Sequence, residues 1–410
     1  MKKIVITAII LVLIAIVVMI IPKEDMAGTQ DLTLSENPII QGNTAFAVDL
    51  YGQIKNQTGN LCFSPYGIST AMAMTYAGAK EQTEQEMAKT MHFTLPQKEL
   101  HAAFGDMEKS IQGLERSGIT ITVANSLWCK NGYSINPDYT DLLKRDYNAM
   151  VSLLDFNNPS ASAKTINSWF SDRTKGMIES IIDSNEIDQN TRAILGNAIY
   201  FKGQWVNKFD KNATRNGRFY TAGMDSFVEV PMMFTSAKCK LVYNDNFSFL
   251  QLPYAGNKLS MILLMPVYYG SLSDLEEQFT ADNVKLWFEK LNQTEKKSIK
   301  VTIPRLKITC HFALDKTLAQ MGMPSLFDSK NANLSGISDK NDLFVSSATH
   351  QAVLEINEEG TTAAAAIRVN HMAKSMPSSF IADHPFLYLI VDNRNGNILF
   401  CGRIIDPTKT

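Results

Sequence analysis

Apolar residues recur at helical spacing through much of the first half of the chain. They fall three and four positions apart, which places them on one face of each helix. The predicted helices cover Thr44–Lys55, Ser69–Ala79, Lys80–Met91 and Lys164–Lys175. The second is rich in Ala and Met and is expected to be buried. In the fourth, Ile166, Trp169 and Phe170 are expected to face inward.

Alternating and β-branched positions dominate several later segments, which indicates strands. The predicted strands are Ile119–Trp128, Arg192–Phe201, Phe247–Leu252, Leu259–Met265, Ile299–Leu306, Gln351–Ile356, Phe386–Val391 and Ile398–Gly402. Few short hairpin turns join them, and helices lie between them. This mixture predicts an α+β fold with large sheets.

The start of the chain differs from the rest. Lys2 and Lys3 precede an apolar run at Ile4–Ile21, which has the form of an export signal. The run is near the lower limit for a spanning helix, about 17–25 residues. No strong small-x-small cleavage site follows it, which favours a retained anchor with the lysines inside. A cleaved signal peptide, with a weak site at Ala27-Gly28, is the alternative.

Three parts are therefore expected: a signal or membrane anchor at 1–22, a polar linker at 23–36 and one large domain at 37–410. No second linker and no internal repeat follows position 37. With an export signal or anchor at its start, the protein is expected outside the cytoplasm. It would be secreted or held on the outer face of the cell membrane by residues 4–21.

Composition and charge narrow the function classes. Hydrophobic residues make up 45% and charged residues 20%, and the formal net charge is −2. This is globular composition, and nothing in the charge favours nucleic acid as a partner. The five cysteines are scattered singly without metal-ligand spacing, and we expect small buried apolar groups. They are Cys62, Cys129, Cys239, Cys310 and Cys401.

Catalytic motifs are missing from the sequence. It contains no G-x-S-x-G, no H-E-x-x-H and no glycine-rich phosphate loop, and its six histidines are scattered. The sequence therefore predicts a protein that is not an enzyme and that uses no cofactor and no metal.

One stretch between two predicted core strands is unusual. Residues 358–380 read EEGTTAAAAIRVNHMAKSMPSSF and show no sustained period after the four alanines. Alanine is a poor strand former, yet its small side chain can enter a crowded sheet. A connection of about twenty residues between core strands is uncommon and is usually functional.

This stretch resembles the hinge and reactive-centre loop of the serpin family, the serine protease inhibitors. Further motifs of that family occur in family order along the whole domain. They are Asn60–Pro65 (N-x-x-x-S-P), Asn197–Trp205 (N-x-x-x-F-K-G-x-W), Pro304–Leu306, His350–Ala352, Asp383–Phe386 (D-H-P-F) and Phe400–Arg403 (F-x-G-R). One such motif alone is weak, but six in order are specific.

The resemblance implies the serpin fold, with about nine helices, three β-sheets and an exposed reactive-centre loop. It also implies a suicide substrate, whose loop is cleaved to an acyl-enzyme and then inserts into the main sheet, trapping the protease. The partner would be a serine protease and the inhibitor a monomer. The hinge residues that match are Glu358, Glu359, Gly360, Thr361, Thr362, Ala363, Ala364, Ala365 and Ala366.

Insertion as a strand requires alternate side chains to enter the core. One parity class of the loop consists of small or apolar side chains, with a threonine at its start, which favours inhibition. Its members are Thr361, Ala363, Ala365, Ile367 and Val369. Family loop length, counted back from Pro385 or forward from Thr361, places the cleaved bond at Lys374–Ser375. A lysine there suits a trypsin-like protease with an acidic specificity pocket.

By the same resemblance, Ser64, Asn197 and His350 would form a polar shutter beneath the strands that open. Trp205, Arg305 and Glu358 would lie at the breach, where the loop first enters, with the last two as a surface ion pair. The sequence departs from the family pattern at two positions. Gly67 replaces a usual serine, so one shutter hydroxyl is missing, and Gln351 replaces a common lysine.

Two alternative functions stay open at this stage. The first is a non-inhibitory serpin that acts as a binding or chaperone module. The second is inhibition of a cysteine protease, because trapping requires only an acyl-enzyme.

Overall fold

The computed structural model describes residues 31–409 except 115–117, 341 and 359–377. From Asp31 to Thr410 the chain forms one compact unit. The predicted signal or anchor segment, the hinge residues 359–366 and the predicted bond Lys374–Ser375 lie outside the described residues. Within the described part, no helix is long and apolar enough to cross a membrane.

The described residues contain nine α-helices. The four predicted helices are present as α2, α3, α4 and α7, and their first residues lie four to six positions before the predicted ones except in α4, which begins one position later. Proline at the first turn and a polar cap begin α2, α3 and α7, with Asn37, Ser64 and Asn158 as caps. The bounds are α2 Pro38–Ile54, α3 Pro65–Tyr76, α4 Glu81–Thr90, α5 Gln97–Gln112, α6 Pro137–Tyr147, α7 Pro159–Arg173, α8 Leu272–Glu277, α9 Ala281–Gln293 and α10 Asp315–Met321.

The strands form a five-stranded and a nine-stranded hydrogen-bonded network. The long strand β6 belongs to two sheets, since it pairs with β7 at one end and with β5 and β9 at the other. The bounds are β1 Leu61–Phe63, β2 Ile119–Lys130, β3 Met150–Leu154, β4 Ala193–Gly203, β5 Arg215–Tyr220, β6 Phe227–Tyr243, β7 Phe247–Pro253, β8 Leu259–Pro266, β9 Lys297–Pro304, β10 Leu306–Ala313, β11 Val345–Ile356, β12 Ser379–Ile381, β13 Phe386–Asp392 and β14 Ile398–Ile404. The α+β prediction is confirmed.

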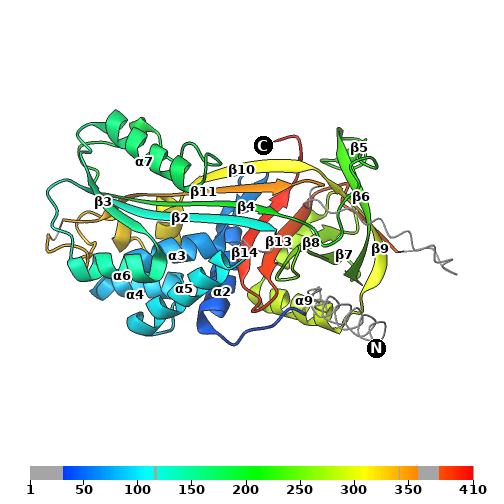
Figure 1. Ribbon diagram of the computed structural model, residues 1–410, viewed down its shortest axis with the longest axis horizontal. Helices are drawn as coiled ribbons and strands as arrows, with labels where there is room; N and C mark the ends of the chain where they lie inside the picture. The colour runs from blue at the N-terminus through cyan, green and yellow to red at the C-terminus, as the bar shows by residue number, and fades with distance from the viewer. Residues whose placement is uncertain (1–30, 115–117, 341, 359–377, 410) are drawn as a thin grey trace, which may run out of the picture. The chain divides into compact units, whose positions relative to one another are not determined.

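The five-stranded sheet has the order β10-β11-β4-β2-β3. Figure 1 shows it in profile, with α7 on one face and α3 to α6 on the other. The central strand β4 and its neighbour β11 are parallel, and His350 lies opposite Asn197. β11 is also the strand from which the predicted loop departs.

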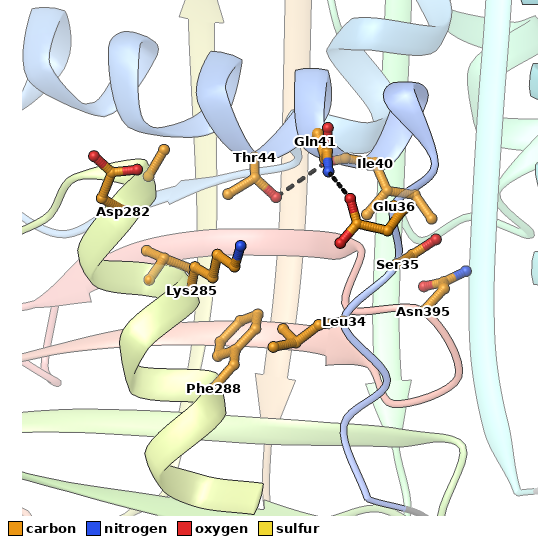
Figure 2. Close-up of a pocket in the computed structure, with 12 residues that line it drawn as sticks. Leu34, Ser35, Glu36, Ile40, Gln41, Thr44, Asp282, Lys285, Phe288 and Asn395 are labelled. Carbon is orange, nitrogen blue, oxygen red and sulfur yellow. Dashed lines mark hydrogen bonds between the residues drawn. The ribbon is translucent and has the colours of Figure 1, made fainter.

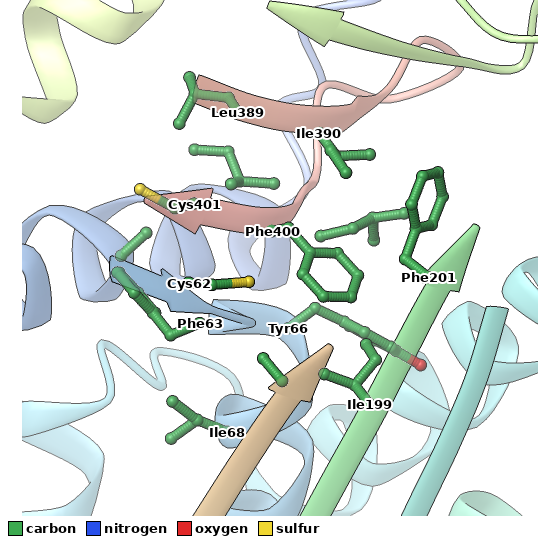
Figure 3. Close-up of a cluster of buried hydrophobic side chains, with 14 of the residues drawn as sticks. Cys62, Phe63, Tyr66, Ile68, Ile199, Phe201, Leu389, Ile390, Phe400 and Cys401 are labelled. Atoms are coloured by element: carbon green, nitrogen blue, oxygen red, sulfur yellow. The ribbon is translucent and has the colours of Figure 1, made fainter. Parts of the chain in front are cut away.

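A buried core joins this sheet to the larger network. Side chains of β4, β14, β13 and β1 meet those at the start of α3 (Figure 3). Phe201 on β4 packs against Phe400 on β14 and against Tyr254, with ring centroids 5.6 and 5.1 Å apart. This packing fixes the position of β4 relative to β14.

Two boundaries differ from expectation. The predicted strand Ile299–Leu306 is in fact the end of β9 and the start of β10. The chain leaves the nine-stranded network at Pro304 and enters the five-stranded sheet at Leu306. Between them, the backbone N–H of Arg305 donates to the carbonyl of Pro231. In addition, the compact unit begins at Asp31, inside the predicted linker, and Leu32 is buried.

Candidate functional site

A chain of buried hydrogen bonds crosses the contact between β11 and β4. His350 and Asn197 face each other with Nδ1 and Oδ1 2.5 Å apart. Ser64, at the start of α3, donates its backbone N–H to Nε2 of His350 at 3.1 Å. The structure therefore brings together all three residues assigned to the shutter.

This geometry defines the tautomer of His350. Because a backbone amide can only donate, Nε2 of His350 is an acceptor and Nδ1 carries the proton. His350 is fully buried, and burial lowers its pKa to about 3, with a smaller contribution from His311. The imidazole is accordingly neutral at physiological pH, and each ring nitrogen has a partner.

Asn125 on β2 is a fourth member that sequence reasoning missed. Its Oδ1 accepts from Nδ2 of Asn197 at 2.6 Å, so the chain extends across three strands. The strand pattern of β2 gave no signal for it beyond a polar residue among buried ones. A buried polar chain with every member paired holds its strands in one arrangement.

Ser64 connects this chain of hydrogen bonds to helix α3. Its Oγ accepts the N–H of Gly67, as a helix cap does, and donates to the carbonyl of Leu399 at 2.6 Å. A Cβ at Gly67 would lie 2.8 Å from Oδ1 of Asn197. The glycine that departs from the family pattern is therefore in close contact with Asn197, and the missing hydroxyl leaves neither Ser64 nor Asn197 without partners.

The three breach residues lie near the C-terminal end of β11. The indole N–H of Trp205 donates to the carbonyl of Asn357 at 2.9 Å, and its ring stacks on Tyr254 at 4.4 Å. Glu358 accepts from the hydroxyl of Thr214 at 2.8 Å, and Arg305 lies 3.5 Å from the same oxygen. The last described residues before the loop are thus held by side chains from outside their own strand.

The Arg305–Glu358 pair is not the surface pair expected from sequence. The arginine side chain is 50% exposed, but the glutamate is only 5% exposed. Thr214 supplies the shorter of the two contacts, at 2.8 Å against 3.5 Å for Arg305. Breaking the ion pair alone would therefore leave the carboxylate with one good partner.

A second cross-strand contact closes the same end of the sheet. Lys202 on β4 and Glu355 on β11 are register partners, and their Nζ and Oε1 are 2.9 Å apart. Tyr200 also donates to Glu355, at 3.2 Å. These groups are partly exposed, so they hold the strands together less firmly than the buried chain does.

The five cysteines are all free, and four of them are buried. Burial raises the pKa of the Cys129 and Cys239 thiols to about 12 and that of Cys310 to about 11. Thiols of this kind are unreactive, because the thiolate is the reactive form. Among the described residues, no cluster of His, Cys, Asp or Glu could hold a metal ion.

A pocket of about 280 Å³ lies between the start of α2 and α9. Figure 2 shows its apolar side chains, Leu34, Ile40 and Phe288, together with the charged Glu36, Asp282 and Lys285. None of the residues predicted from sequence to act in the site lines it. It is therefore separate from the polar chain between β4 and β11.

Comparison with known families identifies the class. Residues 41–407 match the Serpin (serine protease inhibitor) family model, so the chain belongs to the serpins. It is 37% identical to the human leukocyte elastase inhibitor over 89% of this chain and 98% of that protein. It is 32% identical to an uncharacterized serpin-like protein of Thermococcus kodakarensis, over 91% of this chain and 86% of that protein.

Solved structures agree with this fold. Maspin superposes with a TM-score of 0.82 at 27% identity, over 90% of this chain and 98% of that one. The mouse protein-Z dependent protease inhibitor also gives 0.82, at 25% identity, over 90% and 97%. The serpin fold is thus confirmed. The family implies a protease as partner.

Proposed function

We propose that this serpin is a suicide-substrate inhibitor of a trypsin-like serine protease, cleaved at Lys374–Ser375. The cleaved loop then enters the five-stranded sheet between β11 and β4. The single observation that carries the proposal is the parallel contact between these two strands, closed by the His350–Asn197 hydrogen bond.

The topology supports insertion at this place. A segment that follows β11 and folds back along it would be antiparallel to β11. Because β4 is parallel to β11, the same segment would be antiparallel to β4 as well. One parallel contact would be exchanged for two antiparallel ones, and parallel pairs are slightly less stable per residue.

Length and side-chain size support the same conclusion. The fourteen residues Thr361–Lys374 would make a strand of roughly 45 Å at about 3.3 Å per residue. β11 has 12 residues and β4 has 11, so such a strand would span both. The small residues of one parity class could face the core between them.

The target class rests on Lys374 alone. A lysine at the cleaved bond suits an acidic specificity pocket. The similar human and pig proteins are named leukocyte elastase inhibitors, and elastase is therefore the first alternative target to compare.

The test is a denaturing gel after incubation of the protein with trypsin, with leukocyte elastase or with a cysteine protease. A band stable to denaturation, at the summed mass of protein and trypsin, is the expected result. Cleavage at Lys374 without such a band for any protease would overturn the inhibitor proposal and favour the binding or chaperone module. A band with cysteine proteases alone would favour the second alternative.

We further propose that the protein is not an enzyme, which the missing catalytic motifs support.

We also propose that residues 1–22 act as export signal or anchor, placing the domain outside the cytoplasm. The charge and length of the apolar run support this export proposal. Membrane fractionation and the intact mass of the purified protein test it. An intact mass that begins at Met1 in the membrane fraction is expected for an anchor. A soluble cytoplasmic protein with an uncleaved N-terminus would contradict both forms.

A further inference from the structure

An exposed surface rich in lysine lies where the chain re-enters the fold after the predicted loop. β12 pairs with β9, and the backbone N–H of Lys300 donates to the carbonyl of Ser378 at 2.9 Å. On the other side of β9, Ser236 of β6 lies opposite Lys300, and Lys238 lies opposite Ser298. We call the surface formed by Ser236, Lys238, Ser298 and Lys300 the lysine face.

The register places both lysines on one side of the sheet. Residues directly opposite in an antiparallel pair share a face, and diagonal neighbours lie about 7–8 Å apart. Lys238 and Lys300 are such diagonal neighbours, and both are exposed. The hydroxyls of Ser236 and Ser298, 3.2 Å apart, lie between them. Lys297, at the start of β9, is also exposed, but it lies opposite Cys239 and so belongs to the other side of the sheet.

These charges are not neutralised within the protein. In the described part of the chain, neither Lys238 nor Lys300 forms an ion pair. The nearby Lys240 differs, because its buried ammonium is 2.7 Å from the carboxylate of Asp31. The segment 294–300, TEKKSIK, carries one acidic residue, and the segment 236–240, SAKCK, carries none. The surface therefore keeps a net positive charge.

The position of the lysine face relative to the predicted bond follows from chain length. Ser375 lies three positions before Ser378, and extended chain spans at most about 3.6 Å per residue. The bond is therefore within roughly 14 Å of the Lys300 backbone. A protease domain of about 200 residues has a radius of gyration of about 16 Å. A protease bound at Lys374–Ser375 would extend over the lysine face.

We propose that the lysine face is a second contact for the target protease and selects proteases with an acidic surface beside the active-site cleft. The inference rests on the proposed function. A bilayer is the other occupant to consider, since the predicted anchor precedes Asp31. A bilayer on this face would leave no room for a protease at the neighbouring bond, so the protease is favoured.

The contact would act on the rate of association, because unpaired surface charges steer encounter and lose this effect as salt screens them. The experiment compares the full chain with Lys238→Glu/Lys300→Glu in neutral detergent. The rate of formation of the gel-stable complex is measured with an anionic and a cationic trypsin, at low and at high ionic strength. The matched control is Lys144→Glu/Lys164→Glu, which changes net charge equally at exposed positions on α6 and α7.

For the anionic trypsin we expect the charge reversal to slow complex formation about 10-fold at low salt, with little effect at high salt. For the cationic trypsin we expect it to speed complex formation. The control should change either rate by less than about twofold. The milder Lys238→Gln/Lys300→Gln, with an unchanged thermal midpoint, should give an intermediate effect and excludes misfolding as the cause.

Three outcomes would overturn the inference. Equal rates of complex formation for the wild type, Lys238→Glu/Lys300→Glu and Lys238→Gln/Lys300→Gln would show that the lysine face makes no second contact. The proposed function would stay intact. Binding to phosphatidylglycerol vesicles that is lost in Lys238→Glu/Lys300→Glu, with protease rates unchanged, would assign the face to a lipid surface. Absence of any gel-stable complex would defeat the proposed function and the inference together.

Discussion

His350 on β11 donates a hydrogen bond to Asn197 on β4, and their Nδ1 and Oδ1 atoms lie 2.5 Å apart in the core. The same bond joins the two strands between which the loop is proposed to enter. Opening the sheet would separate two buried polar groups, each costing about 1–3 kcal/mol if left unpaired. The bond is therefore one of the interactions that resist opening until a new strand supplies partners.

The neutral state of His350 predicts a pH dependence. Its pKa is about 3 in the folded protein and near 6.5 in the unfolded chain, so between these values the unfolded state binds the additional proton. The free energy of unfolding should then fall as pH falls through this window, by up to about 1.4 kcal/mol per pH unit. His350→Gln should be less stable at neutral pH and show a shallower fall below pH 6.5.

Denaturant unfolding of both proteins between about pH 4 and pH 8 measures this. The comparison isolates His350, because the buried His101, whose pKa burial lowers to about 4, is common to both. Parallel pH profiles for the variant and the wild type would show that His350 is not the group responsible.

Gly67 provides a test of the packing around the polar chain. Alanine is a better helix former than glycine by about 1 kcal/mol, so Gly67→Ala should stabilise α3 if propensity alone decided. The added Cβ would lie 2.8 Å from Oδ1 of Asn197, which His350 already holds. We expect a net loss of about 1–3 kcal/mol in the free energy of unfolding, because a buried hydrogen bond must be displaced.

The matched control is Gly52→Ala in α2, where a Cβ would meet nothing within 4 Å. That change should stabilise by about 0.5–1 kcal/mol. Thermal and urea unfolding measure both variants. A Gly67→Ala protein as stable as the Gly52→Ala protein would contradict the close contact with Asn197.

Sequence pattern predicted the fold best where one pattern, such as an unbroken apolar run, holds throughout an element. The predicted strand Phe386–Val391 differs from β13 by a single residue, because every side chain there is apolar and buried. The predicted helix at Thr44–Lys55 began six residues late. Asn37 and Pro38 are the cap and first residue of α2, and this signal was present in the sequence.

Other features could not be read from pattern. β6 runs for 17 residues and changes sheets on the way, so its buried face is not one continuous parity class. Asn125 belongs to the polar chain only because β2 lies beside β4. Docking of the predicted linker at Asp31 depends on Lys240, more than 200 positions away. Such pairings follow from tertiary structure alone.

The parity of the loop gives a prediction at two adjacent positions. Thr361→Arg would place a charge on the side of the inserted strand that faces the core, where an unpaired charge is strongly unfavourable. Thr362→Arg adds the same charge on the opposite side and serves as the control. We expect the first variant to be cleaved by trypsin without a stable complex, and the second to keep inhibiting.

The number of inhibitor molecules consumed per protease trapped measures the difference. It should rise at least about 10-fold for Thr361→Arg, because slow insertion lets the acyl-enzyme hydrolyse. Equal values for the two variants would count against insertion in this register.

The central claim, that the loop enters between β11 and β4, can be tested by locking these strands together. Lys202 and Glu355 are register partners at the end where insertion would begin. Neighbouring strands lie about 4.8 Å apart, which is within the Cα separations that a disulfide bridges. Lys202→Cys/Glu355→Cys should therefore form a disulfide on oxidation.

The measurement is the fraction of trypsin trapped in a gel-stable complex by this variant, oxidised and then reduced, with each single-cysteine variant as control. We predict that the oxidised protein is cleaved at Lys374–Ser375 without trapping trypsin, and that reduction restores the complex. Full trapping by the oxidised protein, with the disulfide verified by mass spectrometry, would contradict insertion between β11 and β4.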